Sequence, residues 1–94
     1  MKVRLTSEAW HDILAIGDHI AMDNPVRART FMRELRSKAH DLADMPYAFP
    51  LVPRFERYGI RRRAHGPYLI FYIVEEANVA VLRILHAPAI MGDC

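Results

Sequence analysis

The sequence predicts an α+β fold in a single domain, residues 1–94. Its elements run in the order β-α-α-β-β-β, with a helical hairpin packed on one face of a small antiparallel sheet. The first observation is helical periodicity in the first half of the chain, where apolar residues recur at intervals of three, four and seven. The second is a series of short apolar or alternating runs in the second half. The third is the length of 94 residues, which leaves no room for two separate cores.

The first half of the chain is expected to hold one strand and two helices. Residues 2–6 alternate polar and apolar side chains, which predicts a strand, and Ser7 is the expected N-cap of the helix that follows. Asn24 and Pro25 suit the N-cap and first position of a second helix, which should end near Asp44 because Pro46 disfavours helix before it. The expected buried stripes are Trp10, Ile13, Leu14, Gly17, Ile20 and Ala21, then Ala28, Phe31, Met32, Leu35, Ala39 and Leu42.

The second half is expected to hold a proline-rich connector and three strands. The connector contains Pro46, Pro50 and Pro53, and residues 57–63 then alternate as a strand does. After a turn at residues 65–67, residues 68–74 are nearly all apolar, which predicts a central strand covered on both faces. A second turn at residues 76–78 leads to the last strand, residues 79–86. The tail, residues 87–94, has no clear periodicity.

The composition excludes several classes of protein. The chain is 52% hydrophobic and 26% charged with a net charge of +2, which is typical of a globular protein. Its longest apolar run is far shorter than the roughly 20 residues that span a bilayer, and no export signal is visible, so we expect a cytoplasmic location. Cys94 is the only cysteine and the five histidines lack metal-ligand spacing, so no disulfide, metal or cofactor is expected.

The excess positive charge is concentrated in one segment. Five arginines face only Glu56 within ten residues: Arg54, Arg57, Arg61, Arg62 and Arg63. The run Arg61, Arg62 and Arg63 is either a binding surface or a solvated edge strand, whose charges oppose edge-to-edge aggregation.

Arg83 and His86 are the remaining candidates in the last strand. Arg83 interrupts an apolar strand, so it either reaches a binding surface or forms an internal ion pair. His86 either contacts a partner or closes the strand by a hydrogen bond. A regular strand places the two on opposite faces, so a shared site requires a bulge or a strand end near Leu85.

Six segments of the chain carry short motifs in a fixed order. Residues 8–16 are similar to "A..DL..I", residues 23–31 to "..NP..A..F", and residues 42–46 to "L...P". Residues 59–62 and 67–72 resemble "G.R......YLI.Y", and residues 81–86 resemble "I.RVLH" in the last strand. In this order the motifs resemble the ParE/RelE superfamily of toxins from bacterial type II toxin–antitoxin modules. The resemblance covers essentially the whole chain and implies the same fold as the periodicity.

The resemblance implies one of two activities. ParE-like members trap or inhibit DNA gyrase, and RelE-like members cleave mRNA in the ribosomal A site. Both kinds are held inactive by an antitoxin. The Asn-Pro helix start and the Leu-His ending are ParE-like, which implies a growth-inhibiting gyrase inhibitor of the kind found in plasmid stabilisation, with a ParD-like antitoxin. The expected target-binding residues are Arg61, Arg62, Arg63, Arg83 and His86, with the C-terminal segment. The expected antitoxin-binding residues, which are otherwise core, are Trp10, Ile13, Phe31 and Leu35.

Two alternatives remain open. In a ribosome-dependent RNase, Arg61, Arg83 and His86 would supply the cations and the acid. Some RelE-like enzymes have a tyrosine after that histidine, whereas this chain has Ala87, and its connector offers only Glu56 as a carboxylate base. The other alternative is an inactive relic that only binds antitoxin and helps to repress its own operon.

Overall fold

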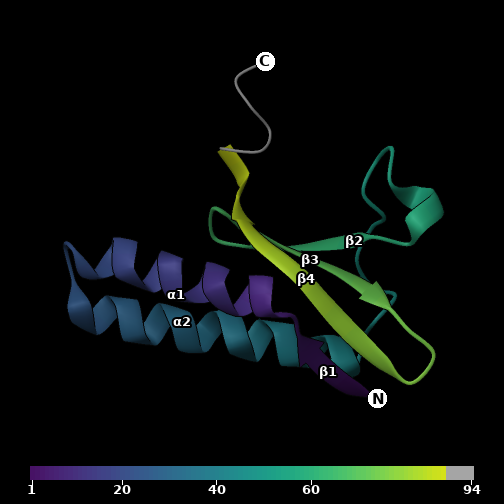
Figure 1. Cartoon of the computed structure of the whole chain (residues 1–94), viewed down its shortest axis with the longest axis horizontal. Helices are drawn as coiled ribbons and strands as arrows, with labels where there is room; N and C mark the ends of the chain where they lie inside the picture. Colours follow the sequence, from purple (N-terminus) through teal and green to yellow (C-terminus); the bar gives the residue numbers. More distant parts are fainter. Residues whose placement is uncertain (89–94) are drawn as a thin grey trace.

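A computed structural model describes residues 1–88 and places a helical hairpin on one face of a four-stranded sheet (Figure 1). The helices lie side by side, and the connector between the second helix and the sheet projects beyond the edge strand. The elements are β1 (Lys2–Leu5), α1 (Ser7–Ala21), α2 (Pro25–His40), the 3-10 turns η1 (Asp41–Ala43) and η2 (Glu56–Tyr58), β2 (Arg61–His65), β3 (Tyr68–Val74) and β4 (Asn78–His86).

The sheet has the order β1-β4-β3-β2. Both pairs within β2, β3 and β4 are antiparallel, as expected for strands joined by short turns. β1 pairs with β4 in parallel, so the sheet is mixed rather than antiparallel. The parallel pair is possible because the helical hairpin lies between β1 and the other strands in the chain. The predicted α+β class and element order are confirmed.

The helix boundaries follow local capping chemistry. Thr6, rather than the expected Ser7, is the N-cap of α1, and its hydroxyl accepts the N–H of Ala9 at 3.1 Å. Asn24 caps α2 as predicted, accepting the N–H of Arg27 at 3.0 Å. α2 continues into η1, so helical structure ends close to the expected position.

The strand predicted for residues 57–63 is displaced. β2 begins at Arg61, because Glu56–Tyr58 forms a 3-10 turn that closes at Gly59. Gly59 has φ 73°, a left-handed conformation that favours glycine and that a strand does not contain. The alternation of Tyr58 and Ile60 therefore does not belong to a strand. The turn predicted for residues 65–67 is shorter than expected, because His65 still pairs with Tyr68 and only residues 66–67 connect β2 to β3.

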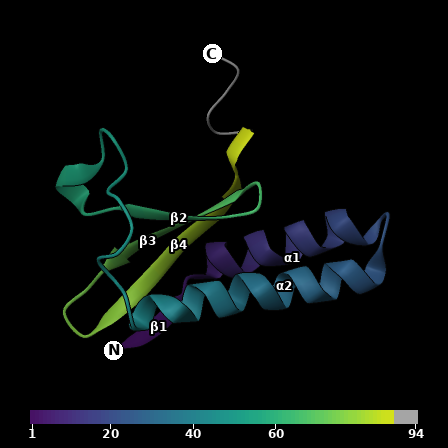
Figure 2. The ribbon, with the colours of Figure 1, turned by 180° about the vertical axis from the view of Figure 1, so that it is seen from behind.

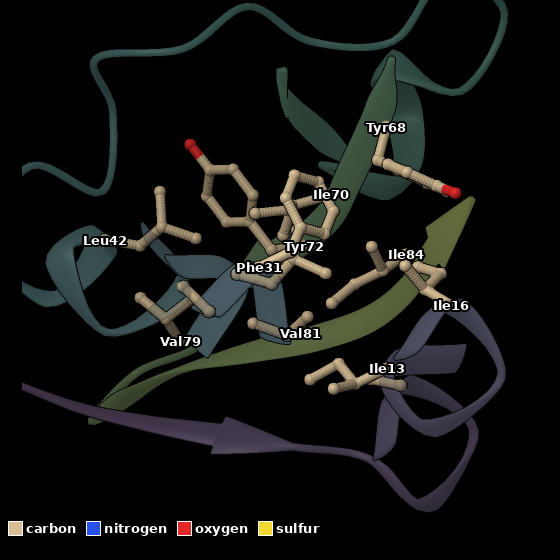
Figure 3. Close-up of a cluster of buried hydrophobic side chains, with 13 residues drawn as sticks. Ile13, Ile16, Phe31, Leu42, Tyr68, Ile70, Tyr72, Val79, Val81 and Ile84 are labelled. Carbon is tan, nitrogen blue, oxygen red and sulfur yellow. The ribbon is translucent and has the colours of Figure 1, made fainter. Parts of the chain in front are cut away.

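The core lies between the helices and one face of the sheet (Figure 3). The stripe predicted for the second helix is buried by α2 and η1 together, except that Met32 is only partly covered. In α1 the buried residues are Ala9, Ile13, Ile16 and Gly17, whereas Trp10 and Leu14 are 39% and 50% exposed. The expected face of α1 is therefore rotated, because a period of 3.6 fits two neighbouring stripes and only packing against the sheet selects one.

The opposite face of the sheet is not covered by helices (Figure 2). The prediction that β3 is covered on both faces is therefore only partly confirmed: of the side chains that point away from the hairpin, Leu69 is buried, whereas Phe71 and Ile73 are only partly buried. Within residues 1–88, no helix combines the length and apolar character needed to cross a bilayer.

Candidate functional surfaces

A groove of about 520 Å³ lies on the face of the sheet that the helices leave open. We call it the open-face groove. Its lining is mostly apolar and comes from the connector, β3 and β4: Val52, Phe55, Ile60, Phe71, Leu82 and Leu85, with Arg62 and Arg83 as the charged members. Apolar hollows with a few charged groups are the usual form of binding sites, so this groove is the first candidate surface.

A β-bulge in β4 shapes one side of this groove. Phe71 pairs with Arg83, whereas the next residue, Tyr72, pairs with Val81, so Leu82 is an extra residue in β4. An extra residue shifts the alternation of side chains by one position. The bulge therefore places Arg83 on the open face, where it lines the groove and where its guanidinium also reaches Asp12 of α1.

Arg83 and His86 remain on opposite faces of the sheet. The bulge that would bring them together must lie between them, but this one precedes Arg83. Ile84 is buried against the helices, and His86 pairs with Tyr68 on that same face. Arg83 and His86 therefore line different hollows, with Asp12, the partner of Arg83, in the lining of the hollow beside His86.

Asp12 of α1 holds Arg83 in place. Its carboxylate accepts Nε of Arg83 at 2.7 Å and Nη2 at 3.0 Å, and it also accepts the backbone N–H of Ile84 at 2.8 Å. The Asp12 side chain is 13% exposed and that of Arg83 is 48% exposed. The hydrogen bond that Arg83 donates to Asp12 raises the pKa of Arg83 above its ordinary value. Arg83 is thus an oriented cation at the edge of the groove. It also forms the internal ion pair that the sequence offered as the alternative to a binding role.

Asp12 and Thr6 together satisfy the free edge of β4. β1 ends where Leu5 pairs with Val81, so β4 beyond Val81 has a strand neighbour only on the β3 side. The Thr6 hydroxyl donates a hydrogen bond to the carbonyl of Leu82 at 2.9 Å, and the Asp12 carboxylate accepts the backbone N–H of Ile84, two residues further along β4. The sequence did not predict this role, because the helical pattern places Asp12 only on the polar face of α1 and its partners are more than 70 positions away.

The run of three arginines is divided between the two faces of β2. Arg61 donates to the carbonyl of Phe49 at 2.7 Å, and Arg63 donates to the carbonyl of Lys38 at 3.0 Å. Both guanidinium groups also lie over aromatic rings, those of Tyr47 and Phe49. Arg62 alone faces the other way, opposite Phe71 in the open-face groove. Arg61 and Arg63 therefore tie β2, the edge strand, to the connector and α2.

Tyr72 provides a second anchor for the connector. Its ring is fully buried, and its hydroxyl donates to the carbonyl of Pro46 at 2.9 Å. Burial raises the pKa of Tyr72 above its ordinary value, so the hydroxyl stays a neutral donor at physiological pH.

His86 lies beside a separate hollow of about 360 Å³ between α1 and the ends of β3 and β4. Its ring meets that of Tyr68 edge-on at a centroid distance of 5.1 Å, and the lining also includes Asp12 and His19. The chain leaves this region through Ala87, whose N–H donates to the carbonyl of Pro67 at 2.7 Å. The expected binding role of the C-terminal segment falls mostly on residues 89–94, which lie outside the described residues.

The residues of the RNase alternative do not converge. Arg61 pairs with Tyr72 and His86 pairs with Tyr68, so they are separated by four positions of β3, about 13 Å at the usual strand rise. Arg83 lies on the other face, held by Asp12. Across residues 1–88, no group of three or more His, Cys, Asp or Glu side chains could hold a metal ion.

Three of the four residues expected to bind antitoxin are core residues. Ile13 and Leu35 are fully buried and Phe31 is 5% exposed, so they offer a partner almost no surface in this conformation. Trp10 is the exception, at 39% exposed, with the guanidinium of Arg36 lying 5.3 Å from its ring centroid.

A polar cluster that sequence reasoning did not foresee joins α2 to the β2–β3 hairpin. Glu34 accepts Nη1 of Arg27 at 2.9 Å and lies 3.0 Å from Nε2 of His65. The hydrogen bonds from Arg27 and then His65 lower the pKa of the Glu34 carboxyl below its ordinary value. The His65 ring also stacks on Phe31. No local signal could reveal this cluster, because His65 reads as a turn residue and lies 31 positions from Glu34.

The fold is that of known toxin–antitoxin proteins. The solved structure of a chromosomal ParDE toxin–antitoxin system from P. aeruginosa matches with a TM-score of 0.78 and 22% identity, covering 92% of this chain and 95% of that chain. The toxin–antitoxin complex RelBE2 from Mycobacterium tuberculosis matches with a TM-score of 0.66 and 22% identity, covering 90% and 95%. At this level of identity the likeness shows a common fold.

The family itself follows from the sequence comparison. The family model described as the ParE toxin of the type II toxin–antitoxin system, parDE, matches residues 3–89. No curated protein sequence matches. Because the family match spans most of the chain, the chain belongs to the ParE toxin family, and the resemblance in its six segments is confirmed.

Proposed function

We propose that this ParE-family toxin inhibits DNA gyrase by binding it, and that a ParD-like antitoxin neutralises it. The family match over residues 3–89 carries the proposal. The geometry supports binding rather than RNA cleavage, because Arg61, Arg83 and His86 lie apart and the first two already hold protein groups. A cleavage site needs its acid, base and cations around one phosphate.

The target-binding residues are proposed to act in different ways. Arg62 and Arg83 would contact the target directly, since both line the open-face groove. Arg61 and Arg63 would support that surface by holding the connector. His86 and the C-terminal segment would extend the contact beyond the sheet. Trp10 is the member of the expected antitoxin set with surface to offer.

The test uses purified chain, gyrase, ATP and plasmid DNA. A gyrase poison traps the cleaved intermediate, so denaturing the complexes should release linear DNA in amounts that depend on the chain. Prior incubation with the cognate antitoxin should prevent the effect, which controls for nuclease contamination. Folded chain that changes neither cleavage nor supercoiling would contradict the proposal.

Ribosome-dependent mRNA cleavage is the second candidate, because the fold also matches the RelBE2 complex. It predicts cut mRNA on translating ribosomes, with cutting lost in both Arg61→Ala and His86→Ala. Normal growth of a host that expresses the chain alone would instead favour a relic that only binds antitoxin.

A further inference from the structure

We infer that the open-face groove holds the toxin's protein target through a short apolar segment that carries a carboxylate. The identity of that target, DNA gyrase, rests on the proposed function. The inference itself rests on the charges, walls and position of the groove.

Arg62 supplies the first reason to expect a carboxylate. Its side chain is partly buried in a mostly apolar lining, opposite Phe71, and has no hydrogen-bond or ion-pair partner within residues 1–88. A guanidinium has five N–H donors, and covering it without an acceptor is costly. An occupant that covered this groove would therefore need to bring an anion to Arg62.

Arg83 supplies a second, oriented cation at the edge of the groove. Asp12 engages its Nε and Nη2, which leaves Nη1 without a partner among the described residues. The side chain is still 48% exposed. Because Asp12 is itself fixed by the N–H of Ile84, the guanidinium is pre-organised and loses little freedom when a ligand binds.

The walls of the groove favour a protein segment over nucleic acid. Val52, Ile60, Leu82 and Leu85 are aliphatic, and a volume of about 520 Å³ suits a few side chains of a peptide. Phe55 is 49% exposed at the connector wall. A nucleic acid would instead require a row of cations along its phosphates.

The position of the groove favours the target over the antitoxin. The helical hairpin, on the other face of the sheet, exposes its own apolar side chains, with Leu14 and Val26 at 50% and 65%. Figure 2 shows the connector beyond β2, away from the far end of the hairpin. A neutralising partner therefore has exposed apolar side chains to bind outside the groove, which leaves the groove for the target.

The test compares two groove variants with matched controls. Arg62→Gln removes the unpartnered charge, and Arg33→Gln removes the same charge from an exposed position of α2. Phe55→Ala removes an exposed part of the wall, and Met22→Ala shortens an 83% exposed side chain beyond α1. Thermal unfolding checks that all four fold like the parent. For each chain we would measure the Kd for gyrase, the Kd for the cognate antitoxin, and growth inhibition.

We expect each groove variant to raise the Kd for gyrase about tenfold or more and to relieve growth inhibition, while both controls stay within about twofold. Antitoxin affinity should be unchanged. Groove variants that bind gyrase like the parent would overturn the inference, as would a loss of antitoxin binding alone.

The growth measurement separates this inference from the proposed function. If the parent chain did not bind gyrase, the proposed function would fail. Loss of growth inhibition in both folded groove variants, with antitoxin binding retained, would still support a target-binding groove. Full toxicity in both variants would overturn it whatever the target.

Discussion

Asp12 is the residue on which the free end of β4 depends. Its carboxylate replaces a missing strand neighbour by accepting the N–H of Ile84, and it orients Arg83 at the same time. The two interactions contribute differently to the free energy of unfolding, because the Asp12 side chain is largely covered whereas the Arg83 side chain is half exposed. Solvent screens the ion pair, while a covered N–H without an acceptor loses a full hydrogen bond.

We therefore predict a ranked effect on stability. Asp12→Ala should lower the free energy of unfolding by about 2 kcal/mol, because it leaves the Ile84 N–H unsatisfied. Asp12→Asn keeps an acceptor and should cost less, and Arg83→Ala should cost about 1 kcal/mol or less. Urea unfolding followed by circular dichroism measures all three. An Arg83→Ala variant as unstable as Asp12→Ala would contradict this reading.

At the scale of elements, the close packing of α1 and α2 depends on Gly17. This glycine is buried, and a Cβ added there would meet Cγ and Sδ of Met32 on the facing helix. Glycine lowers helix stability relative to alanine, so its presence in the middle of α1 indicates a steric requirement.

This contact predicts a coupled pair of substitutions. Gly17→Ala gains about 1 kcal/mol of helix propensity but forces Met32 to move, at a cost of about 1–3 kcal/mol. We expect a net loss of stability. In the Met32→Ala background the same change should be neutral or stabilising. A double-mutant cycle by chemical denaturation measures the coupling, and additive effects would show that the helices adjust freely.

At the scale of the whole molecule, stability should be highest in the middle of the sheet. In the order β1-β4-β3-β2, β3 and β4 each have two strand neighbours and carry fully buried residues such as Ile70, Tyr72 and Val81. The connector, by contrast, exposes Tyr47, Phe55 and Tyr58.

Native-state hydrogen exchange should reflect this arrangement. We predict the slowest amides in β3 and β4, close to the rate set by global unfolding, and much faster exchange in residues 47–59. Equal protection in the connector would indicate that its anchors, Arg61, Arg63 and Tyr72, make it part of the same cooperative unit.

The sequence by itself determined the features that local chemistry controls. The cap at Asn24, the start of α2 at Pro25 and the apolar run of β3 depend on neighbouring residues, so they were predicted correctly. The order of such segments was also enough to indicate the ParE toxin family.

Only the tertiary structure decided where the charged candidates lie. The bulge at Leu82 places Arg83 on the open face, and Asp12, 71 positions away in the sequence, binds its guanidinium. In β2, Arg62 lies on the opposite face from Arg61 and Arg63. The buried face of α1 and the parallel pairing of β1 were likewise set by packing. Strand register and edge contacts join segments distant in the chain, and periodicity along one segment carries no information about its partner.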